Sequence, residues 1–310
     1  MGEKTVVKKK RVGKTSLSRK IFVVCNTALL ILLSFGFLAP YINILAKSFN
    51  TAKDTMLGGI TFFPRQFTWD NYDVVLQDPN IVSSALISVA RVVCGSLFSL
   101  FLQYSVAYAL LRKGLPFKKA IVMYFTIPMF IGGGLISEYI IFAKLNLYNN
   151  FLVYILPASF SFYNMVIIRT YLQGIPESLL ESARLDGAGE FTILWKIMLP
   201  LSMPIVATIL LWCAVAHWND WTRTLYFIDN PNLYTLQYRL MLAQKEAESL
   251  QQMIQNAVES GRPLGDISSD ISGESIQAAQ TIITTLPIVL TYPFFQRYFV
   301  SGVTMGSVKE

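Results

Sequence analysis

Long apolar runs separated by polar segments dominate this sequence. Six runs come close to or exceed the roughly 20 residues that a helix needs to cross the hydrocarbon core of a bilayer. They cover residues 21–46, 81–111, 119–143, 151–168, 200–218 and 278–300. A helix satisfies its own backbone polar groups in lipid, so each run is predicted to be a transmembrane helix. In the third run, Pro128 and the glycines at 132–134 predict a kink or a close backbone approach.

The composition supports this prediction. Of the 310 residues, 53% are hydrophobic and 15% are charged, whereas ordinary soluble domains carry about 25% charged residues. We therefore expect an all-α, polytopic membrane protein with six transmembrane helices. A basic tail at residues 1–20 would precede a single membrane domain at residues 21–310. The first apolar run is too long for the core of a cleaved signal peptide, so we expect it to be retained.

Lysine and arginine are distributed unevenly among the polar segments. With the amino terminus inside the cell, the inside segments hold 17 of the 26 Lys and Arg residues and the outside segments hold 8. Cytoplasmic segments are enriched in these residues. Both termini are therefore predicted to be cytoplasmic, in a multi-pass protein of the cell (plasma or inner) membrane. Topology and contact with anionic lipid account for the net charge of +7 without nucleic acid.

A long polar stretch at residues 229–277 precedes the last apolar run and would lie outside the cell. Apolar residues within 234–258 recur at helical spacing, which predicts a helix there. Gly261, Pro263 and Gly265 would end it. The stretch is either an external cap or docking surface for a partner protein, or a tolerated insertion.

The segment at 174–200 is predicted to form a short helix, a sharp bend and a second short helix on the cytoplasmic side. Pro176 suits a first helical turn, and Glu177 and Glu181 follow it near the positive end of the helix dipole. The apolar side of this helix would consist of Leu180, Ala183 and Leu185. Gly187 and Gly189 are natural bends, because glycine accepts a left-handed backbone.

This segment resembles the EAA loop of the permeases of binding-protein-dependent ABC importers. The letters ESARLDGAGEFTILWKIMLP, residues 181–200, match its pattern of E-A-A, three residues, G, nine residues and I-x-L-P. The matching positions are Glu181, Ala183, Asp186, Gly187, Ala188, Ile197, Leu199 and Pro200. Ser182 replaces the second motif residue with another small residue. Pattern, spacing and cytoplasmic position agree over about 20 residues.

The resemblance extends over essentially the whole chain. NYDVVL after the first outer segment and QRYFVSGVTMGSVKE at the carboxyl terminus are similar to the smaller, six-span permease subunit of maltose-type carbohydrate importers. The stretch at 229–277 is similar to that of the LplC- and YtcP-like oligosaccharide branch. The resemblance implies four kinds of partner: a second permease, two ATPase subunits, an extracytoplasmic solute-binding protein and the lipid bilayer. Each permease would form half of the translocation path.

The resemblance also implies how the loop at 174–200 works. In the family, this loop docks into a cleft of a cytoplasmic ATPase, whose closure moves the permease helices. Leu185, Ala188 and Phe191 would fill the apolar cleft, and Glu181 and Asp186 would meet basic groups on its rim. ATP and Mg²⁺ would be used by the partner subunits, and this chain would bind no cofactor. Gly13-Lys14-Thr15 is not a phosphate loop, because Lys8 stands where the first glycine is required.

Residues of the substrate path are indicated by polar groups in the apolar runs. Ionisable residues within a membrane are functional candidates, which points to Arg91 and Glu138. At the outer end of the fifth run, Trp218, Asn219 and Asp220 combine an aromatic ring with polar groups, as sugar sites do. The alternatives are a structural ion pair for Arg91 and Glu138, with each other or with the second permease, and an interfacial aromatic belt for Trp218.

Two other classes of protein remain as alternatives. One is a secondary transporter or channel that works without an ATPase, although no internal repeat is evident. The other is a membrane-embedded enzyme, which the single histidine, His217, disfavours for a catalytic triad. We therefore expect no catalytic residue and no metal site in this chain. An ABC importer for a non-sugar solute is a further alternative.

Overall fold

The computed structural model describes residues 17–112, 114–260 and 273–307. Most of the predicted basic tail and the residues expected to end the external helix lie outside these ranges. Helices joined by turns make up the described part, and no strand is found in it. The all-α prediction is therefore confirmed.

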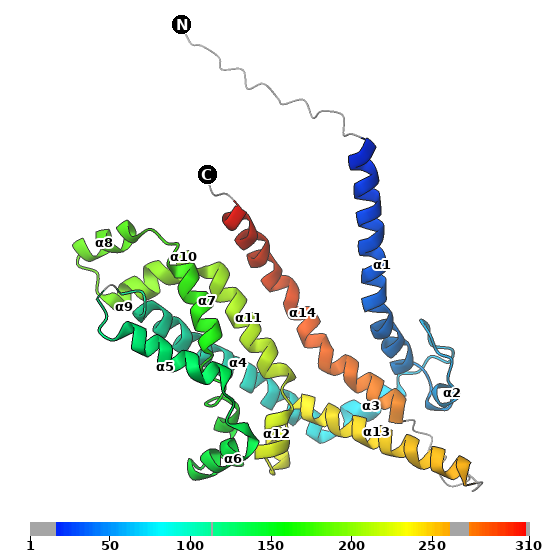
Figure 1. Ribbon diagram of the computed structural model, residues 1–310. Coiled ribbons are helices and arrows are strands. Elements are labelled where there is room, and N and C mark those ends of the chain that lie inside the picture. Colours follow the sequence, from blue (N-terminus) through cyan, green and yellow to red (C-terminus); the bar gives the residue numbers. More distant parts are fainter. Residues whose placement is uncertain (1–16, 113, 261–272, 308–310) are drawn as a thin grey trace.

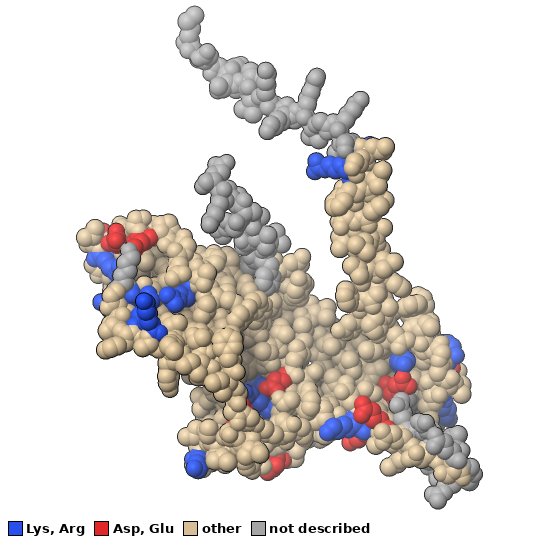
Figure 2. Space-filling model, viewed as in Figure 1, with Lys and Arg blue, Asp and Glu red and all other residues tan. Residues whose placement is uncertain are grey.

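Among the described residues, three helices are long and apolar enough to cross a membrane. They are α1 (Leu17–Ser48), α4 (Pro79–Ala109) and α14 (Gly273–Ser307), and they confirm the first, second and sixth predicted helices. Figure 1 shows α1 and α14 running from the end of the molecule that holds α3 and α13 towards the end that holds α8. Charged side chains gather at these two ends, and an uncharged band covers α1 between them (Figure 2).

The third predicted helix is broken. Helices α5 (Lys118–Phe130) and α6 (Gly134–Lys144) differ in direction by 117°. The break has a local cause, because Ile131 is extended and Gly134 has a left-handed φ of 75°. The predicted kink is therefore present, but it is much sharper than a bend within one continuous helix.

The fourth predicted helix, at 151–168, is wrong as a single span. The chain forms a 3₁₀ turn, η1 (Phe151–Tyr154), and then α7 (Phe162–Leu172) after a non-helical stretch. Pro157 lies in this stretch, and the Ser161 side chain caps the new helix through the amide of Asn164. The 11 residues of α7 extend about 16 Å, which is too short for the hydrocarbon core. With two bent helix pairs counted, the described residues provide three to five spans, so the count of six stays a prediction.

The fifth predicted helix is α11 (Met203–Asn219). An 86° bend separates it from the preceding helical piece. The short elements before the bend are α8 (Glu177–Leu185), α9 (Glu190–Thr192), the π-helix η2 (Ile193–Met198) and α10 (Leu199–Leu201). After α11 come α12 (Thr222–Phe227), the 3₁₀ turn η3 (Pro231–Leu233) and α13 (Leu236–Glu259). The helix predicted at 234–258 is thus confirmed as α13.

Helix α4 is the centre of the helix bundle and packs against α7 and α11. Its buried face consists mainly of small and polar residues, with one arginine among them. They include Ser84, Ser88, Arg91, Gly95, Ser96, Ser99, Gln103 and Ala107. Small residues let helix backbones approach closely in membranes. A Cβ added at Gly95 would lie 2.6 Å from the His217 ring of α11, so only glycine fits at this contact.

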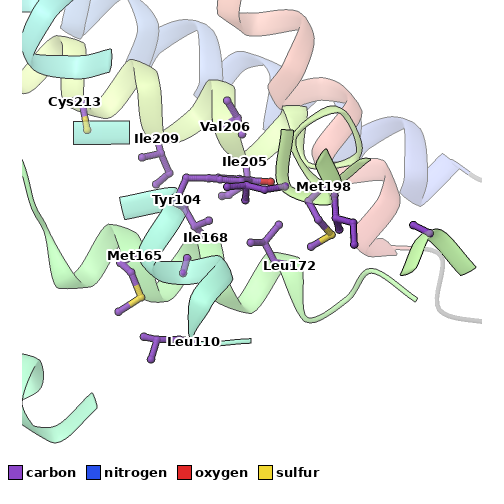
Figure 3. Close-up of a cluster of buried hydrophobic side chains, with 14 residues drawn as sticks. Tyr104, Leu110, Met165, Ile168, Leu172, Met198, Ile205, Val206, Ile209 and Cys213 are labelled. Atoms are coloured by element: carbon purple, nitrogen blue, oxygen red, sulfur yellow. The ribbon is translucent and has the colours of Figure 1, made fainter. Parts of the chain in front are cut away.

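A cluster of buried apolar side chains joins the bundle to the segment that precedes α11. Figure 3 shows Tyr104 of α4, Met165 and Ile168 of α7, and Met198 and Ile209 converging in this cluster. At its edge, the Tyr104 hydroxyl lies 2.7 Å from the Ser202 hydroxyl, at the 86° bend. The bend is therefore packed into the core.

The segment predicted to be the first outer one connects the end of α1 with the start of α14. The fully buried Asn50 accepts hydrogen bonds from the amides of Arg65 and Gln66, each at 2.9 Å. Its amide donates to Asp54 of α2 (Ala52–Met56) at 2.9 Å, and Asp54 also pairs with Arg65. Lys47 forms a 2.6 Å ion pair with Glu274 at the start of α14. These contacts hold the end of α1 and the start of α14 at one loop. Helix α3 (Asp70–Gln77) follows this loop.

Acidification of the solution around this loop is expected to loosen it. The hydrogen bond from Asn50, followed by the contacts of Arg65, lowers the pKa of Asp54 below its ordinary value of 3.8. Because the pKa is lowered, the stabilisation is complete above 3.8 and is lost as the pH falls through the lowered pKa. Hydrogen exchange of the amides of Arg65 and Gln66 at about pH 6 and about pH 3, corrected for intrinsic rates, measures this loss.

Two variants serve as comparisons for the acidification experiment: one removes the titrating carboxylate, and the other removes a carboxylate of α3 as the control. The Asp54→Asn variant should show weakened protection already at about pH 6 and little further change at about pH 3. The Asp73→Asn variant, which alters an exposed carboxylate of α3, should behave like the natural chain. Equal protection of Arg65 and Gln66 at both pH values in the natural chain would contradict the prediction.

Candidate functional site: the docking segment and a buried ion pair

Residues 174–200, here called the docking segment, contain a sharply capped helix. Helix α8 follows Pro176 and ends in two hydrogen bonds, from Gly187 N to Arg184 O at 3.0 Å and from Ala188 N to Ala183 O at 2.9 Å. This is the Schellman arrangement, which requires a left-handed residue, and Gly187 has a φ of 82°. Gly189 is extended instead. Only one of the two glycines predicted to bend the chain therefore does so by a left-handed conformation.

The predicted apolar side of α8 is divided between two surfaces. Ala183 is buried in the core cluster, and Leu180 packs against that cluster. Leu185 points away, with 89% of its surface exposed, and Phe191 of α9 is 80% exposed. The docking segment thus anchors one face in the protein and leaves two large apolar side chains exposed beyond the bend.

The other predicted docking residues differ in their exposure. Glu181 and Asp186 are exposed, and Ala188 is half-buried against the core. Further along, Ile197 is half-buried in η2, and Pro200 is exposed in α10. Charged rims beside exposed apolar centres are typical of protein interfaces, so the arrangement suits a protein partner.

Three residues that no sequence pattern singled out also belong to this region. The hydroxyl of Tyr108, at the end of α4, donates a 2.5 Å hydrogen bond to Oε2 of Glu190. Nε of Arg184 donates to Oε1 of the same carboxylate at 3.2 Å. The hydrogen bond from Tyr108 is the main cause that lowers the pKa of Glu190, and Arg184 adds to it. No spacing rule relates Tyr108 to Glu190, because they are 82 residues apart.

The second notable group is a buried ion pair at the end of α11 that is remote from the docking segment. Arg91 of α4, whose side chain is 1% exposed, pairs with the carboxylate of Asp220 and donates to its backbone carbonyl at 2.6 Å. The guanidinium also lies 4.6 Å from the centre of the Tyr154 ring. Asp220 accepts hydrogen bonds from the amide and hydroxyl of Thr222, which begins α12. The ion pair therefore joins α4, η1 and the connection between α11 and α12.

The structure thus brings together only part of the predicted substrate-path set. Glu138 is exposed on α6, and the alternative that it pairs with Arg91 is wrong, because Asp220 takes that place. Trp218 is buried and donates from Nε1 to the carbonyl of Thr284 in α14 at 3.0 Å. Asn219 is exposed. Arg91 and Trp218 have little surface left for a solute, so Glu138 and Asn219 are the accessible members.

No cluster of three His, Cys, Asp or Glu residues that could hold a metal ion occurs in the described ranges. Cys25, Cys94 and Cys213 are all free thiols. The buried Cys213 lies 3.8 Å from the side-chain amide of Asn164, within the core rather than at an accessible site.

Long apolar helices, a segment at 174–200 that is anchored in the core and a buried ion pair describe a helical membrane protein. The family model for binding-protein-dependent transport system inner membrane components matches residues 116–305. The chain belongs to this family, and it is a transmembrane permease subunit of a binding-protein-dependent ABC importer.

Relatives over nearly the full length agree with this assignment. The polygalacturonan/rhamnogalacturonan transport system permease protein YtcP of Bacillus subtilis (strain 168) is 30% identical, over 94% of this chain and 100% of YtcP. Protein LplC of the same organism is 32% identical, over 94% of this chain and 95% of LplC. A chain in the crystal structure of a bacterial ABC transporter involved in the import of the acidic polysaccharide alginate matches with a TM-score of 0.78. It is 26% identical and covers 92% of this chain and 99% of its own.

Proposed function

We propose that this permease imports oligosaccharides and is driven by ATPase subunits that bind its docking segment. It would form half of the translocation path, together with a second permease, two ATPase subunits that use ATP and Mg²⁺, and an extracytoplasmic solute-binding protein. The single observation that carries the coupling role is the pair of exposed side chains, Leu185 and Phe191, beside a bend fixed by Gly187. Glu181 and Asp186 would meet basic groups around them.

The substrate class is supported by the relatives. YtcP is named for polygalacturonan and rhamnogalacturonan, a 28% identical relative in Halalkalibacterium halodurans, AraQ, is named for arabinooligosaccharides, and the matching structure belongs to an alginate importer. Each of these names denotes a polymer or oligomer of sugars. An importer for a non-sugar solute is the alternative that the substrate assay must exclude.

The orientation is also part of the proposal. The start of α1, the end of α14 and the docking segment lie at one end of the molecule (Figure 1). The Lys and Arg distribution favours the cytoplasmic side for that end, so both termini would be cytoplasmic and α13 extracytoplasmic. Helix α13 belongs to the stretch at 229–277, which would then face the solute-binding protein. The apolar window of α1 is 0% buried, which leaves its surface for lipid or the second permease.

Charge substitution in the docking segment tests the coupling role. The double variant Leu185→Glu, Phe191→Glu is expected to lower the amount of ATPase that copurifies with the tagged permease more than about tenfold, because two apolar anchors would become charged. Leu57→Glu is the matched control, since Leu57 is 82% exposed in the outer segment. Undiminished ATPase recovery in the double variant would refute the docking role.

The substrate class is tested with the assembled complex in proteoliposomes. ATP hydrolysis should rise when the solute-binding protein carries oligogalacturonides or arabino-oligosaccharides. Stimulation by peptides alone would replace the sugar assignment with a non-sugar importer, and uptake without ATP would indicate a secondary transporter.

A further inference from the structure

Part of the end of α4 faces the docking segment across a hollow, beside the core cluster in which the two also pack together. A cavity of about 580 Å³ lies between them. It is lined from α4 and the following turn by Tyr108, Arg112 and Leu115, and from the docking segment by Leu180, Arg184 and Glu190. Since side-chain packing does not fill this space, a displacement of α8 cannot reach the end of α4 by direct compression there.

The Glu190 carboxylate bridges this hollow. One oxygen receives the Tyr108 hydroxyl at 2.5 Å and the other receives Nε of Arg184 at 3.2 Å. Hydrogen bonds to a charged group are short, strong and directional. They fix the relative positions of the groups that they join, whereas apolar contacts are non-directional. One side chain of α9 therefore joins α4 to α8.

The bridge adds little to folding stability. The side chains of Arg184 and Glu190 are 43% and 51% exposed, and ion pairs at such sites contribute about 0–1 kcal/mol. The fold of the docking segment is already fixed by the buried Ala183 and by the capping bonds around Gly187. What the bridge adds is a polar connection at Tyr108, beside the apolar contacts of the core cluster, to α4, the helix that also holds the buried Arg91.

We propose that Glu190, held by Tyr108 and Arg184, is a positioning residue that makes α4 move together with the docking segment. This inference rests on the proposed docking of that segment to an ATPase. Without the bridge, motion of α8 and α9 would be absorbed in the hollow, and α4 would follow it less completely. ATP would then be hydrolysed with less transport.

The test compares transport with ATP use in the assembled complex. Proteoliposomes with the natural chain, Tyr108→Phe or Glu190→Gln are supplied with binding protein and labelled oligogalacturonides, and both uptake and ATP hydrolysis are measured. Each variant is expected to import about five- to tenfold fewer molecules per ATP hydrolysed, in the range of ordinary coupling between two sites. A purely structural defect would lower both rates in proportion and leave their ratio unchanged.

Tyr171→Phe is the matched control. Tyr171 of α7 packs beside the same core cluster, and its hydroxyl has no hydrogen bond to any residue in the described ranges. This variant should keep the ratio of the natural chain. An unchanged ratio in both Tyr108→Phe and Glu190→Gln would overturn the positioning role while the docking proposal stands. Lack of ATP-dependent uptake by the natural complex would instead overturn the proposed function, and the positioning role with it.

Discussion

Asp220→Asn is expected to lower the free energy of unfolding by about 3–5 kcal/mol, because it leaves the buried charge of Arg91 without its partner. Asparagine can still accept the hydrogen bonds that Thr222 donates to Asp220, so the start of α12 is preserved. The loss then reports on the ion pairs of this carboxylate, with the buried Arg91 and, at 3.5 Å, with the partly exposed Arg223. Reversible unfolding in mixed micelles, followed by circular dichroism, measures the change.

A second variant separates the ion pair from general damage at this position. Adding Arg91→Met to Asp220→Asn removes the uncompensated charge and should recover most of the lost stability. The control is Asp70→Asn, which alters an exposed carboxylate at the start of α3 and should cost less than about 1 kcal/mol. If Asp220→Asn were as stable as the natural chain, the pair would not stabilise the bundle.

Gly95→Leu is expected to destabilise the bundle by about 3 kcal/mol or more, because overpacking at a tight contact forces backbones apart. The clash begins at the first side-chain carbon, which would lie 2.6 Å from two atoms of the His217 ring. Both residues are buried, so neither can turn aside into solvent. The same micelle unfolding measurement reports the effect.

A second substitution that makes room for the leucine checks whether the clash with His217 causes the loss of stability. Adding His217→Ala to Gly95→Leu exchanges the large and small sides of the contact and should recover a substantial part of the stability. Gly36→Leu is the matched control in α1, because nothing lies within 4 Å of a Cβ added at Gly36. Equal losses for Gly36→Leu and Gly95→Leu would show that glycine replacement, rather than the contact with His217, is responsible.

The sequence predicted those features that depend on neighbouring residues. Uninterrupted apolar length predicted α1, α4 and α14, and helical spacing predicted α13. The docking segment was recognisable because Pro176, Gly187 and the residues between them encode a capped helix locally. Hydropathy failed at 151–168, since it counts apolar residues and does not register a helix break around Pro157.

Features that depend on contacts between residues far apart in the chain could not be predicted from the sequence in the same way. Arg91 was selected as a buried charge, but its partner lies 129 residues away, and the sequence offered Glu138 equally well. The Asn50 contacts and the bond between Tyr108 and Glu190 likewise arise only when separate helices meet. The division of α8 into an anchored Ala183 and an exposed Leu185 depends on which neighbour covers each face.

The bend at Ser202 allows the docking segment to act as a lever on α11. The helical piece from α9 to α10 meets α11 at 86°. A force applied to this piece along the direction of α11 therefore has a turning moment about the corner. The hydroxyl contact between Ser202 and Tyr104 places the pivot against α4. At the far end of α11, Trp218 donates a hydrogen bond to the carbonyl of Thr284 in α14. A push on the docking segment along the direction of α11 would therefore tilt α11 about this corner and load its contact with α14.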